Sequence, residues 1–556
     1  MSAADDDRTL LVWSDAPESF EARARWVFET LLTPCGRRLA LTRDTARLPG
    51  CALAYASVPQ PGVPTIPCSA AALELLAAGR PLPPGSFVRL ITAAGELTGA
   101  WPAAASAAPA AGADAAAFAA PFDLVASAFV LLACWDEHTH GERDRFGRLP
   151  YGASVFAENQ ALDIADPAVD GCVRLLRVLL GPRLAALGRA PLPAPGWLWS
   201  NGVTSAPLTN GGVTGDGASP ARVSAGGPRF AVALTHDVDN LWRWTPRGFA
   251  AAGYRSARAL RHGDVAALRR ELGDVVTWLT HHLPRRSDPY WTFPQLLAGE
   301  DERGLPSTFF VIARHTHRQD GVQPRTYTRR IPAALTLLAR HGREIGLHGN
   351  DADRLGVDAL TGDRDLLARR AGCSVGGVRY HYLRCLYHET LPLLERAGLS
   401  YDSSLAFAER EGFRCGCSWP FRPYSLAEER PLDLIELPLA LMDSGLQGAQ
   451  YRALDGQAAE RVSVALLERV AATGGAVAVL WHNNRFDHRS AQGYDDVYWR
   501  LLDWIAAHDG LATTAGDIVA RYRAAAGMGA AAPPSTPAAK ADAAPADTGP
   551  APEAGV

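Results

Sequence analysis

The second half of the sequence alternates short apolar runs with longer segments whose apolar residues recur at helical spacing. Apolar runs bounded by polar or glycine residues favour buried strands, and the amphipathic segments between them favour covering helices. Strands are predicted at residues 230–235, 307–313, 344–348, 377–380, 400–404, 434–439 and 476–481, and helices at 254–282, 294–303, 332–341, 389–397, 457–472 and 495–507. About seven such β/α units predict a distorted parallel β/α barrel.

The first part of the sequence shows the same alternation on a smaller scale. Strand-like segments 9–13, 39–42 and 51–56 and helix-like segments 20–32 and 70–78 predict a smaller α/β domain before the barrel. The composition then shifts to Pro, Gly, Ser, Thr and Asn, as in an interdomain linker. We expect an N-terminal α/β accessory domain at residues 1–190, a linker at 191–228, the barrel at 229–526 and a disordered tail at 527–556.

Composition narrows the class of protein. The 556 residues exceed the size of one ordinary core, and 47% hydrophobic and 21% charged residues are typical of a globular protein. A formal net charge of -4 argues against nucleic acid as a partner, because a phosphate-binding surface normally brings a basic excess. We expect no transmembrane segment, no secretory signal and therefore a cytoplasmic protein. Nine scattered cysteines fit a reducing compartment, and the oligomeric state stays open.

Several predicted strands end in a side chain that can bind a metal or move a proton. Residues i and i+2 of a strand share a face, so Asp237 and Asp239 should stand together after the first strand. In parallel sheets the loops after the strands converge on one rim. The predicted strand ends carry Asp237, Asp239, His348, Arg379, His381 and His482. Asp and His at one rim predict a site for a borderline cation such as Zn²⁺.

Each of these residues also has an ordinary structural interpretation. An Asp at a strand end can cap a helix or form an Asx turn, and a single His can be a hydrogen-bonded structural residue. The repetition of Asp and His residues at strand ends around one rim favours a functional site over separate structural roles. The segment 135–148, dense in charge and aromatic residues, can line a cleft, dock onto the barrel or stay a solvated loop, and docking or solvation is the simpler interpretation.

In these motifs the chain resembles the NodB-homology polysaccharide deacetylases, carbohydrate esterase family 4, over residues 230–523. Thr235-His-Asp-Val-Asp239 resembles the family's acidic strand end, Glu344-Ile-Gly-Leu-His348 its metal-binding motif, and Leu480-Trp-His482 its closing Leu-x-His. Arg379-Tyr-His-Tyr382 and Tyr401-Asp-Ser-Ser404 stand at two further motif positions. Sequences extended around Arg379, Gly412 and Trp481 resemble a bacterial subgroup with an extra N-terminal domain.

The resemblance implies a role for each of these residues. A metal held by Asp239 and His348 would polarise the acetyl carbonyl and acidify a water. Asp237 would take the proton of the water, and His482 would protonate the departing amine or alkoxide. Arg379 would orient Asp237 and keep it ionised. Substrate contact would fall to Tyr382, Asp402 and Trp481.

The sequence departs from the family at one position. The second metal histidine usually lies four residues after the first, and Ala352 stands there. Because catalytic zinc normally takes three protein ligands, the third must come from Asp351, Asp353 or His381, or else the site binds metal weakly or not at all. We expect a divalent metal, with zinc first and cobalt or nickel as alternatives, and His381 as third ligand.

Three functions remain open. The first is a metal-dependent hydrolase of carbon–nitrogen bonds that removes acetyl from an N-acetylated sugar in surface polysaccharide biosynthesis. The second is hydrolysis of a cyclic amide or imide on the same barrel. The third is a catalytically degenerate barrel that binds glycan and acts as an assembly partner, which the presence of Ala352 makes credible.

The composition of the predicted linker leads to a first experiment. Limited proteolysis should cut between residues 191 and 228 and after residue 526, because backbone outside a packed core is accessible to proteases. Mass spectrometry of the early fragments checks this. Rapid cutting inside residues 290–480, with the segment 191–228 intact, would contradict the predicted domain boundaries.

Overall fold

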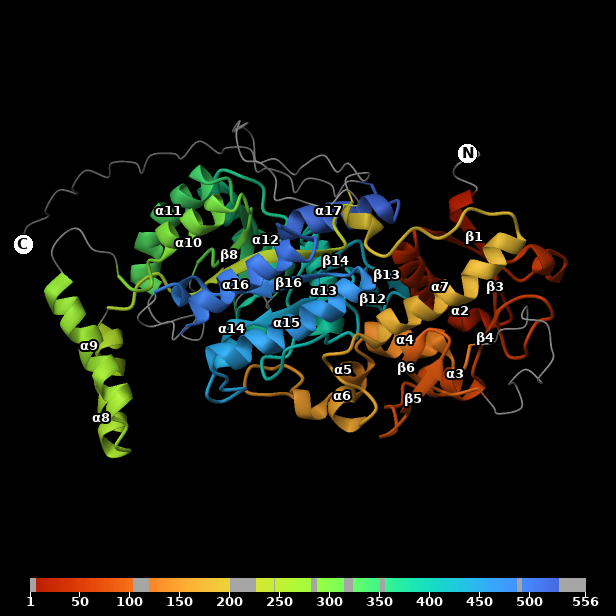
Figure 1. Cartoon of the computed structure of the whole chain (residues 1–556), viewed down its shortest axis with the longest axis horizontal. Helices are drawn as coiled ribbons and strands as arrows, with labels where there is room; N and C mark the ends of the chain where they lie inside the picture. Colours follow the sequence, from red (N-terminus) through yellow and green to blue (C-terminus); the bar gives the residue numbers. More distant parts are fainter. Residues whose placement is uncertain are drawn as a thin grey trace, which may run out of the picture.

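The computed structural model describes residues 7–103, 120–200, 227–244, 246–281, 288–314, 324–350, 356–487 and 493–529. Most of the predicted linker, the predicted tail after residue 529, and the alternative ligands Asp351 and Asp353 with Ala352 between them lie outside these residues. Figure 1 shows the N-terminal region at one end of an elongated molecule and the larger β/α region at the other. Among the described residues no helix has the length and apolar character needed to cross a membrane.

The N-terminal region is built on a four-stranded parallel sheet in the order β2–β1–β3–β4. Its strands are β1 (Thr9–Ser14), β2 (Arg38–Thr42), β3 (Leu53–Ala56) and β4 (Thr65–Pro67), followed by the hairpin β5 (Phe87–Thr92) and β6 (Gly95–Ala100). Its helices are α2 (Glu18–Leu32), α3 (Ala70–Ala77), α4 (Leu124–Leu132), α5 (Trp135–Thr139), α6 (Val155–Glu158) and α7 (Ala168–Ala186). Side chains of Ser69 and Asp123 accept hydrogen bonds from the first turns of α3 and α4 and so fix where these helices begin.

The larger region is organised around β7 (Phe230–Val238), whose nine residues are all buried. The other strands of its sheet are β8 (Thr308–Val311), β9 (Glu344–Gly349), β10 (Gly377–Tyr380), β11 (Tyr401–Asp402), β14 (Ile435–Glu436), β15 (Leu439–Met442), β16 (Ala476–Leu480) and β17 (Gly510–Thr513). They pair in parallel in the order β14–β11–β10–β9–β8–β7–β16–β15, with β17 also paired to β7. Because β14 and β15 end this order and are consecutive in sequence, the sheet curls back on itself, and the predicted distorted barrel is confirmed.

Helices cover the outside of this sheet (Figure 1). They are α10 (Phe293–Glu302), α11 (Pro324–Arg340), α12 (Val357–Ala371), α13 (Tyr387–Arg396), α14 (Asp443–Gln447), α15 (Gly456–Thr473), α16 (Tyr494–Ala507) and α17 (Ala515–Ala525). Two further helices, α8 (Pro246–Arg261) and α9 (Val265–His281), follow β7. A short hairpin, β12 (Tyr424–Ser425) and β13 (Arg430–Pro431), lies beside the sheet. Short 3-10 helices occur at Thr33–Cys35, Thr45–Gly50, Tyr151–Ala153, Trp197–Trp199 and Asn483–Arg485, and a tight turn with left-handed backbone occurs at His381–Leu383.

The structure corrects three of the predicted elements. The single helix expected at 254–282 is two helices, because Gly263 adopts a left-handed conformation between α8 and α9. The helix expected from residue 332 begins at Pro324 and carries Pro332 in its interior. The strand expected at 434–439 is split into β14 and β15, since Pro438 has no amide hydrogen for a ladder.

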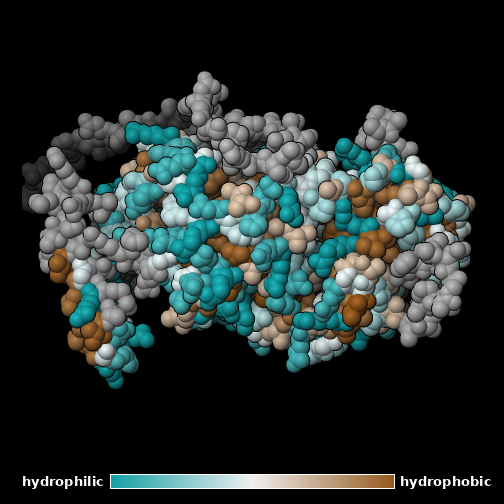
Figure 2. Space-filling view, in the orientation of Figure 1, coloured by the Kyte–Doolittle hydropathy of each residue, from teal (hydrophilic) through white to brown (hydrophobic). Residues whose placement is uncertain are grey.

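Helices α8 and α9 project from the body of the protein. Figure 2 shows hydrophobic colour on this projection, at the lower left. Its exposed large apolar residues are Tyr254, Leu260, Val265, Leu272 and Val276. Residues Ala252 and Ala259, one helical face of α8, are buried. The two helices therefore pack on each other and leave an apolar face outward.

The N-terminal region packs tightly on the barrel. One continuous cluster of buried apolar residues includes side chains from both regions. The indole nitrogen of Trp26 donates to the carbonyl oxygen of Arg422 at 2.7 Å. In the segment that follows the N-terminal region, the indole nitrogen of Trp199 donates to the carbonyl oxygen of Gly474 at 2.8 Å. Glu137, on α5, forms a fully buried ion pair with Arg414 and accepts the amide hydrogen of Tyr387 at the start of α13. The contact surface therefore includes charge that is removed from water.

This buried ion pair gives a stability prediction. Arg414→Met should destabilise the protein by about 3–5 kcal/mol, because Glu137 would remain buried without a cation. The double variant Glu137→Gln/Arg414→Met should recover much of that loss. As a control, Arg430→Met removes a partly exposed partner of Glu395 and should cost about 1 kcal/mol or less. Thermal denaturation followed by circular dichroism measures all three, and equal effects of Arg414→Met and Arg430→Met would contradict the prediction.

Candidate metal and catalytic site

The strand ends of the barrel bring four of the predicted residues to one place. Asp239 follows the end of β7, His348 lies in β9, His381 follows β10 and His482 follows β16. The curl of the sheet brings these separate strands together at its C-terminal rim. The sequence alone indicated a common rim, and the structure supplies the distances between the atoms.

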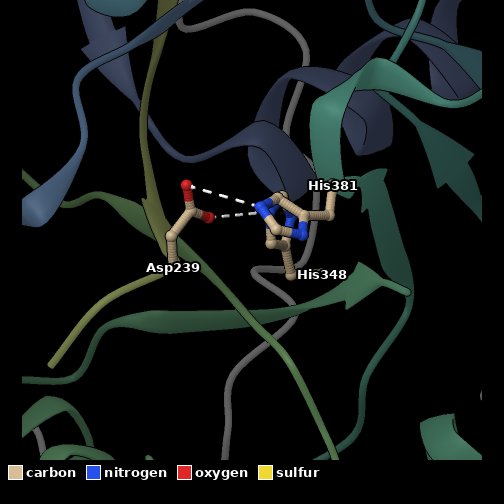
Figure 3. A group of neighbouring side chains, drawn as sticks. All are labelled: Asp239, His348 and His381. Atoms are coloured by element: carbon tan, nitrogen blue, oxygen red, sulfur yellow. Dashed lines mark ion pairs between the residues drawn. The ribbon is translucent and has the colours of Figure 1, made fainter. Parts of the chain in front are cut away.

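Asp239, His348 and His381 form a compact group of possible metal ligands. One ligand atom from each lies within 4.8 Å of the others, and no second group of this kind exists among the described residues. Figure 3 shows the carboxylate of Asp239 facing the two imidazole rings. Nε2 of His348 lies 3.0 Å from Oδ1 of Asp239, and Nε2 of His381 lies 3.7 Å from Oδ2. Ligands of a tetrahedral zinc ion are about 3.3 Å apart, since each bond is about 2.0–2.2 Å.

The hydrogen bond of His348 uses its Nδ1 atom and leaves Nε2, the nitrogen that faces Asp239, to bind a cation. Its Nδ1 lies 2.9 Å from the carbonyl oxygen of Arg379. A carbonyl oxygen only accepts, so Nδ1 carries the hydrogen and Nε2 of the neutral ring presents its lone pair toward Asp239. Within the described part of the chain, Nε2 of His348 and Oδ1 of Asp239 are buried and make no hydrogen bond. Two buried polar atoms that face each other in this way fit a divalent cation between them.

The electrostatics of Asp239 agree with this interpretation. Loss of hydration opposes its ionisation, but the neighbouring rings of His381, His482 and His348 outweigh that effect and hold the pKa of Asp239 well below its ordinary range. The pKa of His348 is raised, because Asp237 and Asp239 outweigh the effect of its burial. The group therefore combines negatively charged carboxylates with histidines whose protonation they favour. A bound cation beside neutral histidines would balance the same negative charge.

The carboxylate of Asp237 is paired with the guanidinium of Arg379. Nη1 of Arg379 donates to Oδ1 of Asp237 at 3.1 Å and to Oγ1 of Thr235 at 2.7 Å. The remaining nitrogens of Arg379 donate to the backbone oxygen and the hydroxyl of Ser403, at 2.8 and 2.9 Å. Arg379 is completely buried, and its guanidinium lies over the ring of Phe310. Because each nitrogen of Arg379 donates at least one hydrogen bond, the guanidinium is fixed and holds Asp237 in a single orientation.

His482 has a carboxylate partner that the sequence did not indicate. Its Nδ1 lies 2.6 Å from Oδ1 of Asp443, at the start of α14, and its Nε2 lies 3.4 Å from Oδ2 of Asp239. Burial opposes protonation of His482, but Asp443 and Asp239 outweigh it and raise its pKa to about 9. Arg485 donates to the other oxygen of Asp443 at 3.2 Å. Asp443 follows strand β15, so the strand-end rule that found Asp237 applies to it as well.

The residues predicted to contact substrate differ in position. Tyr382 is 41% exposed and its ring stacks on that of His381 at 3.9 Å between centroids. Asp402 is fully buried and accepts hydrogen bonds from the amide and hydroxyl of Ser404. Trp481 is also fully buried, and its indole nitrogen donates to the carbonyl oxygen of Tyr494. Only Tyr382 of the three lies at the surface of the site.

A further buried histidine, His236, supports the end of β7 from the opposite face. His236 directly precedes Asp237 in β7, so the two side chains point to opposite faces of the sheet. Nδ1 of His236 lies 2.7 Å from the carbonyl oxygen of Trp481. Its Nε2 lies 3.0 Å from Oε1 of Glu300, which also accepts a hydrogen bond from Tyr498. Burial alone would raise the pKa of Glu300, but His236, together with Arg343 and Ser307, outweighs that effect and lowers it. This pair joins β7 to β16, α10 and α16 directly behind the site.

Comparison with known proteins gives one family match, in the N-terminal region. Residues 91–184 match a family of unknown function, DUF7033. A search of the curated proteins finds no match. The family match begins at the end of β5 and covers β6, α4 to α6 and most of α7, together with the segment 135–148.

Solved structures similar to this chain include the following three. A protein described as a polysaccharide deacetylase from Mycobacterium smegmatis is 20% identical, with 57% of this chain and 97% of that chain covered and a TM-score of 0.37. The Puue allantoinase is 14% identical, with 56% and 95% covered and a TM-score of 0.36. A protein described as a polysaccharide deacetylase from Pseudomonas aeruginosa PAO1 is 14% identical, with 54% and 92% covered and a TM-score of 0.36. At these identities the similarity concerns the fold alone.

The geometry of the group predicts which substitutions remove a bound metal. The purified protein should bind close to one equivalent of zinc or cobalt. Asp239→Asn should abolish this binding, and His381→Ala should weaken it by more than the roughly ten- to hundredfold loss typical of a residue that only supports a ligand. Isothermal titration calorimetry with Zn²⁺ and Co²⁺ measures both effects.

The control for this experiment is His508→Ala, because His508 is exposed and lies outside the group. It should leave the affinity unchanged. An affinity of His381→Ala equal to that of His508→Ala would remove His381 from the set of ligands and return attention to Asp351 and Asp353.

Proposed function

We propose that the protein is a metal-dependent hydrolase of carbon–nitrogen bonds that removes acetyl from an N-acetylated sugar in surface polysaccharide biosynthesis. One observation carries the proposal: the ligand group Asp239, His348 and His381 lies between two carboxylate partnerships, Asp237 with Arg379 and His482 with Asp443. A cation site between an oriented base and a protonated acid is the equipment that amide hydrolysis needs.

A divalent cation held by Asp239, His348 and His381 would supply polarisation of the amide carbonyl and a lower pKa for the attacking water. Asp237 is the base in this proposal, since Arg379 fixes its orientation and its other oxygen remains directed to the same side as His348, with Oδ2 3.9 Å from Nδ1 of His348. The proton that Asp237 receives comes from the water as it adds to the carbonyl carbon.

His482 is the acid. Its pKa, raised to about 9 by Asp443 and Asp239, keeps the ring protonated at neutral pH. Its Nε2 points toward Asp239, so a proton on that nitrogen faces the site, while Nδ1 is held by Asp443. The imidazolium then gives its Nε2 proton to the amine nitrogen as the carbon–nitrogen bond breaks, which prevents expulsion of an unstable amide anion.

The choice of an N-acetylated sugar rests on the motifs around Thr235, Glu344 and Leu480, which resemble those of carbohydrate esterase family 4. The cytoplasmic location, zinc as the metal and the carbohydrate as the partner are parts of the same proposal. A cyclic amide is the second substrate class to be assayed, because the same base, acid and cation would serve a ring amide as well.

An assay of activity together with metal content distinguishes the proposed base from the metal ligands. Asp237→Asn should reduce acetate release from N-acetylglucosamine oligomers by at least about a hundredfold, because a general base contributes roughly that much or more, while metal content stays at the wild-type value. Acetate release is measured with a coupled assay and metal with atomic emission. Asp503→Asn, at an exposed carboxylate, is the matched control.

Three outcomes would contradict the proposal. Wild-type activity in Asp237→Asn would remove the proposed base. Hydrolysis of cyclic amides without acetate release would change the substrate class. Glycan binding with no turnover and no metal under any loading condition would favour a degenerate barrel that acts as an assembly partner.

A further inference from the structure

A loop of the N-terminal region reaches the rim of the barrel beside the ligand group. The ring of Phe146 stacks on that of Tyr382 with centroids 4.7 Å apart and planes 12° apart. The ring of Tyr382 in turn stacks on the imidazole of His381, with centroids 3.9 Å apart and planes 24° apart. A continuous stack of three rings therefore connects Phe146 to a candidate metal ligand.

The loop that carries Phe146 has a fixed shape. Oδ1 of Asp144 accepts the amide hydrogens of Phe146 and Arg148, at 2.8 and 3.0 Å. Oδ2 of Asp144 accepts from Nε and Nη2 of Arg148, at 2.9 and 2.6 Å. The guanidinium of Arg148 also lies over the ring of Phe146. Asp144 thus closes the loop and orients both side chains toward the barrel.

Arg148 extends this contact to the backbone after β10. Its Nη1 donates to the carbonyl oxygen of Tyr382 at 2.6 Å, and its side chain is almost completely buried. Arg384 approaches the rings of both Tyr382 and Phe146 with its guanidinium, at 5.2 and 5.4 Å from their centroids. The turn after His381 is therefore held on its outer side by groups from the N-terminal region and the barrel together.

This turn needs outside support because of its conformation. Tyr382 has φ 58° and ψ 17°, and Leu383 has φ 55°. Two consecutive non-glycine residues in the left-handed region are unfavourable, and such backbone persists only where its surroundings fix it. His381, directly before these residues, has its direction set by the same turn.

We infer that Phe146 and Arg148 are positioning residues of the site: they hold Tyr382, and through it the imidazole of His381, in place against Asp239. The inference rests on the proposed function for the meaning of the site, and it gives the N-terminal region a part in it. The loop lies within residues 91–184, which match the family of unknown function. On this basis the N-terminal region completes the site of the barrel and is more than an attached domain.

The experiment compares Phe146→Ala with a variant that breaks another contact between the same two regions. Arg23→Ala removes the ion pair of Arg23 with Glu429, away from the strand ends that form the site. Histidine-selective NMR of the full chain, with the His381 signal assigned from His381→Ala, reports the position of the ring without added metal. Phe146→Ala should shift the His381 signal, Phe146→Tyr should restore it, and Arg23→Ala should leave it unchanged.

Metal affinity is the second readout. Phe146→Ala should weaken Co²⁺ binding roughly ten- to hundredfold, as expected for a residue that orients a ligand. In the His381→Ala background the same substitution should have no further effect, because its influence passes through His381. Phe146→Leu, which retains volume and removes the aromatic face, replaces Phe146→Ala if that variant fails to fold.

The two proposals fail separately. An unshifted His381 signal in Phe146→Ala and Phe146→Leu, or equal shifts in these and in Arg23→Ala, would overturn the positioning role whatever the activity of the protein. A shifted His381 signal in a protein that hydrolyses no amide would support the positioning role and contradict the proposed function alone.

Discussion

The structure depends on the placement of two carboxylates at the end of its central strand. Asp237 is the second-last residue of a strand in which every residue is buried, and Asp239 directly follows that strand, so their charges must be met by protein groups. Arg379, itself completely buried, neutralises the first, and histidines from β9, the turn after β10 and the end of β16 surround the second. These partners come from three strands, β9, β10 and β16, with Arg379 in β10 and His381 directly after it. The two carboxylates at the end of β7 therefore depend on the curl of the sheet, which brings these partners to them. The same curl sets the positions of the candidate site residues.

The pattern of apolar residues was sufficient to predict the barrel. Runs such as Ser307–Ala313 and Ala476–Trp481 are buried on both faces, and a continuous apolar run has few alternatives to a central strand. Predictions failed where one residue changed the backbone. Gly263 breaks a helix that its neighbours favour, Pro438 divides a strand, and Pro332 is tolerated inside α11. Each of these residues is compatible with more than one structure, and tertiary packing decides among them.

The candidate site could be predicted from the sequence only in part. The sequence pattern identified four of the candidate residues because each closes an apolar run: Asp237, Asp239, His348 and His482. It identified His381 because Ala352 stands where a second metal histidine is usual, so a third ligand had to be sought elsewhere. The segment 135–148 could be recognised as one that docks onto the barrel, but the partner of its Phe146 and Arg148 could not, since Tyr382 lies more than two hundred positions away and no periodic pattern links them. Such long-range contacts are decided by how the two regions dock, and docking leaves little trace in a single sequence.

The pairing of β7 also has a consequence for the order in which the protein is made. His236 contacts the carbonyl of Trp481, 245 residues further along the chain, and β7 also pairs with β17 at residues 510–513. The sheet of the N-terminal region, by contrast, is complete within the first 67 residues. During synthesis the N-terminal sheet can fold while β7 still lacks two of its neighbours. The N-terminal sheet, made before the barrel, is therefore available as a preformed surface while the barrel is completed, and the rim that carries the candidate site is among the last parts to assemble.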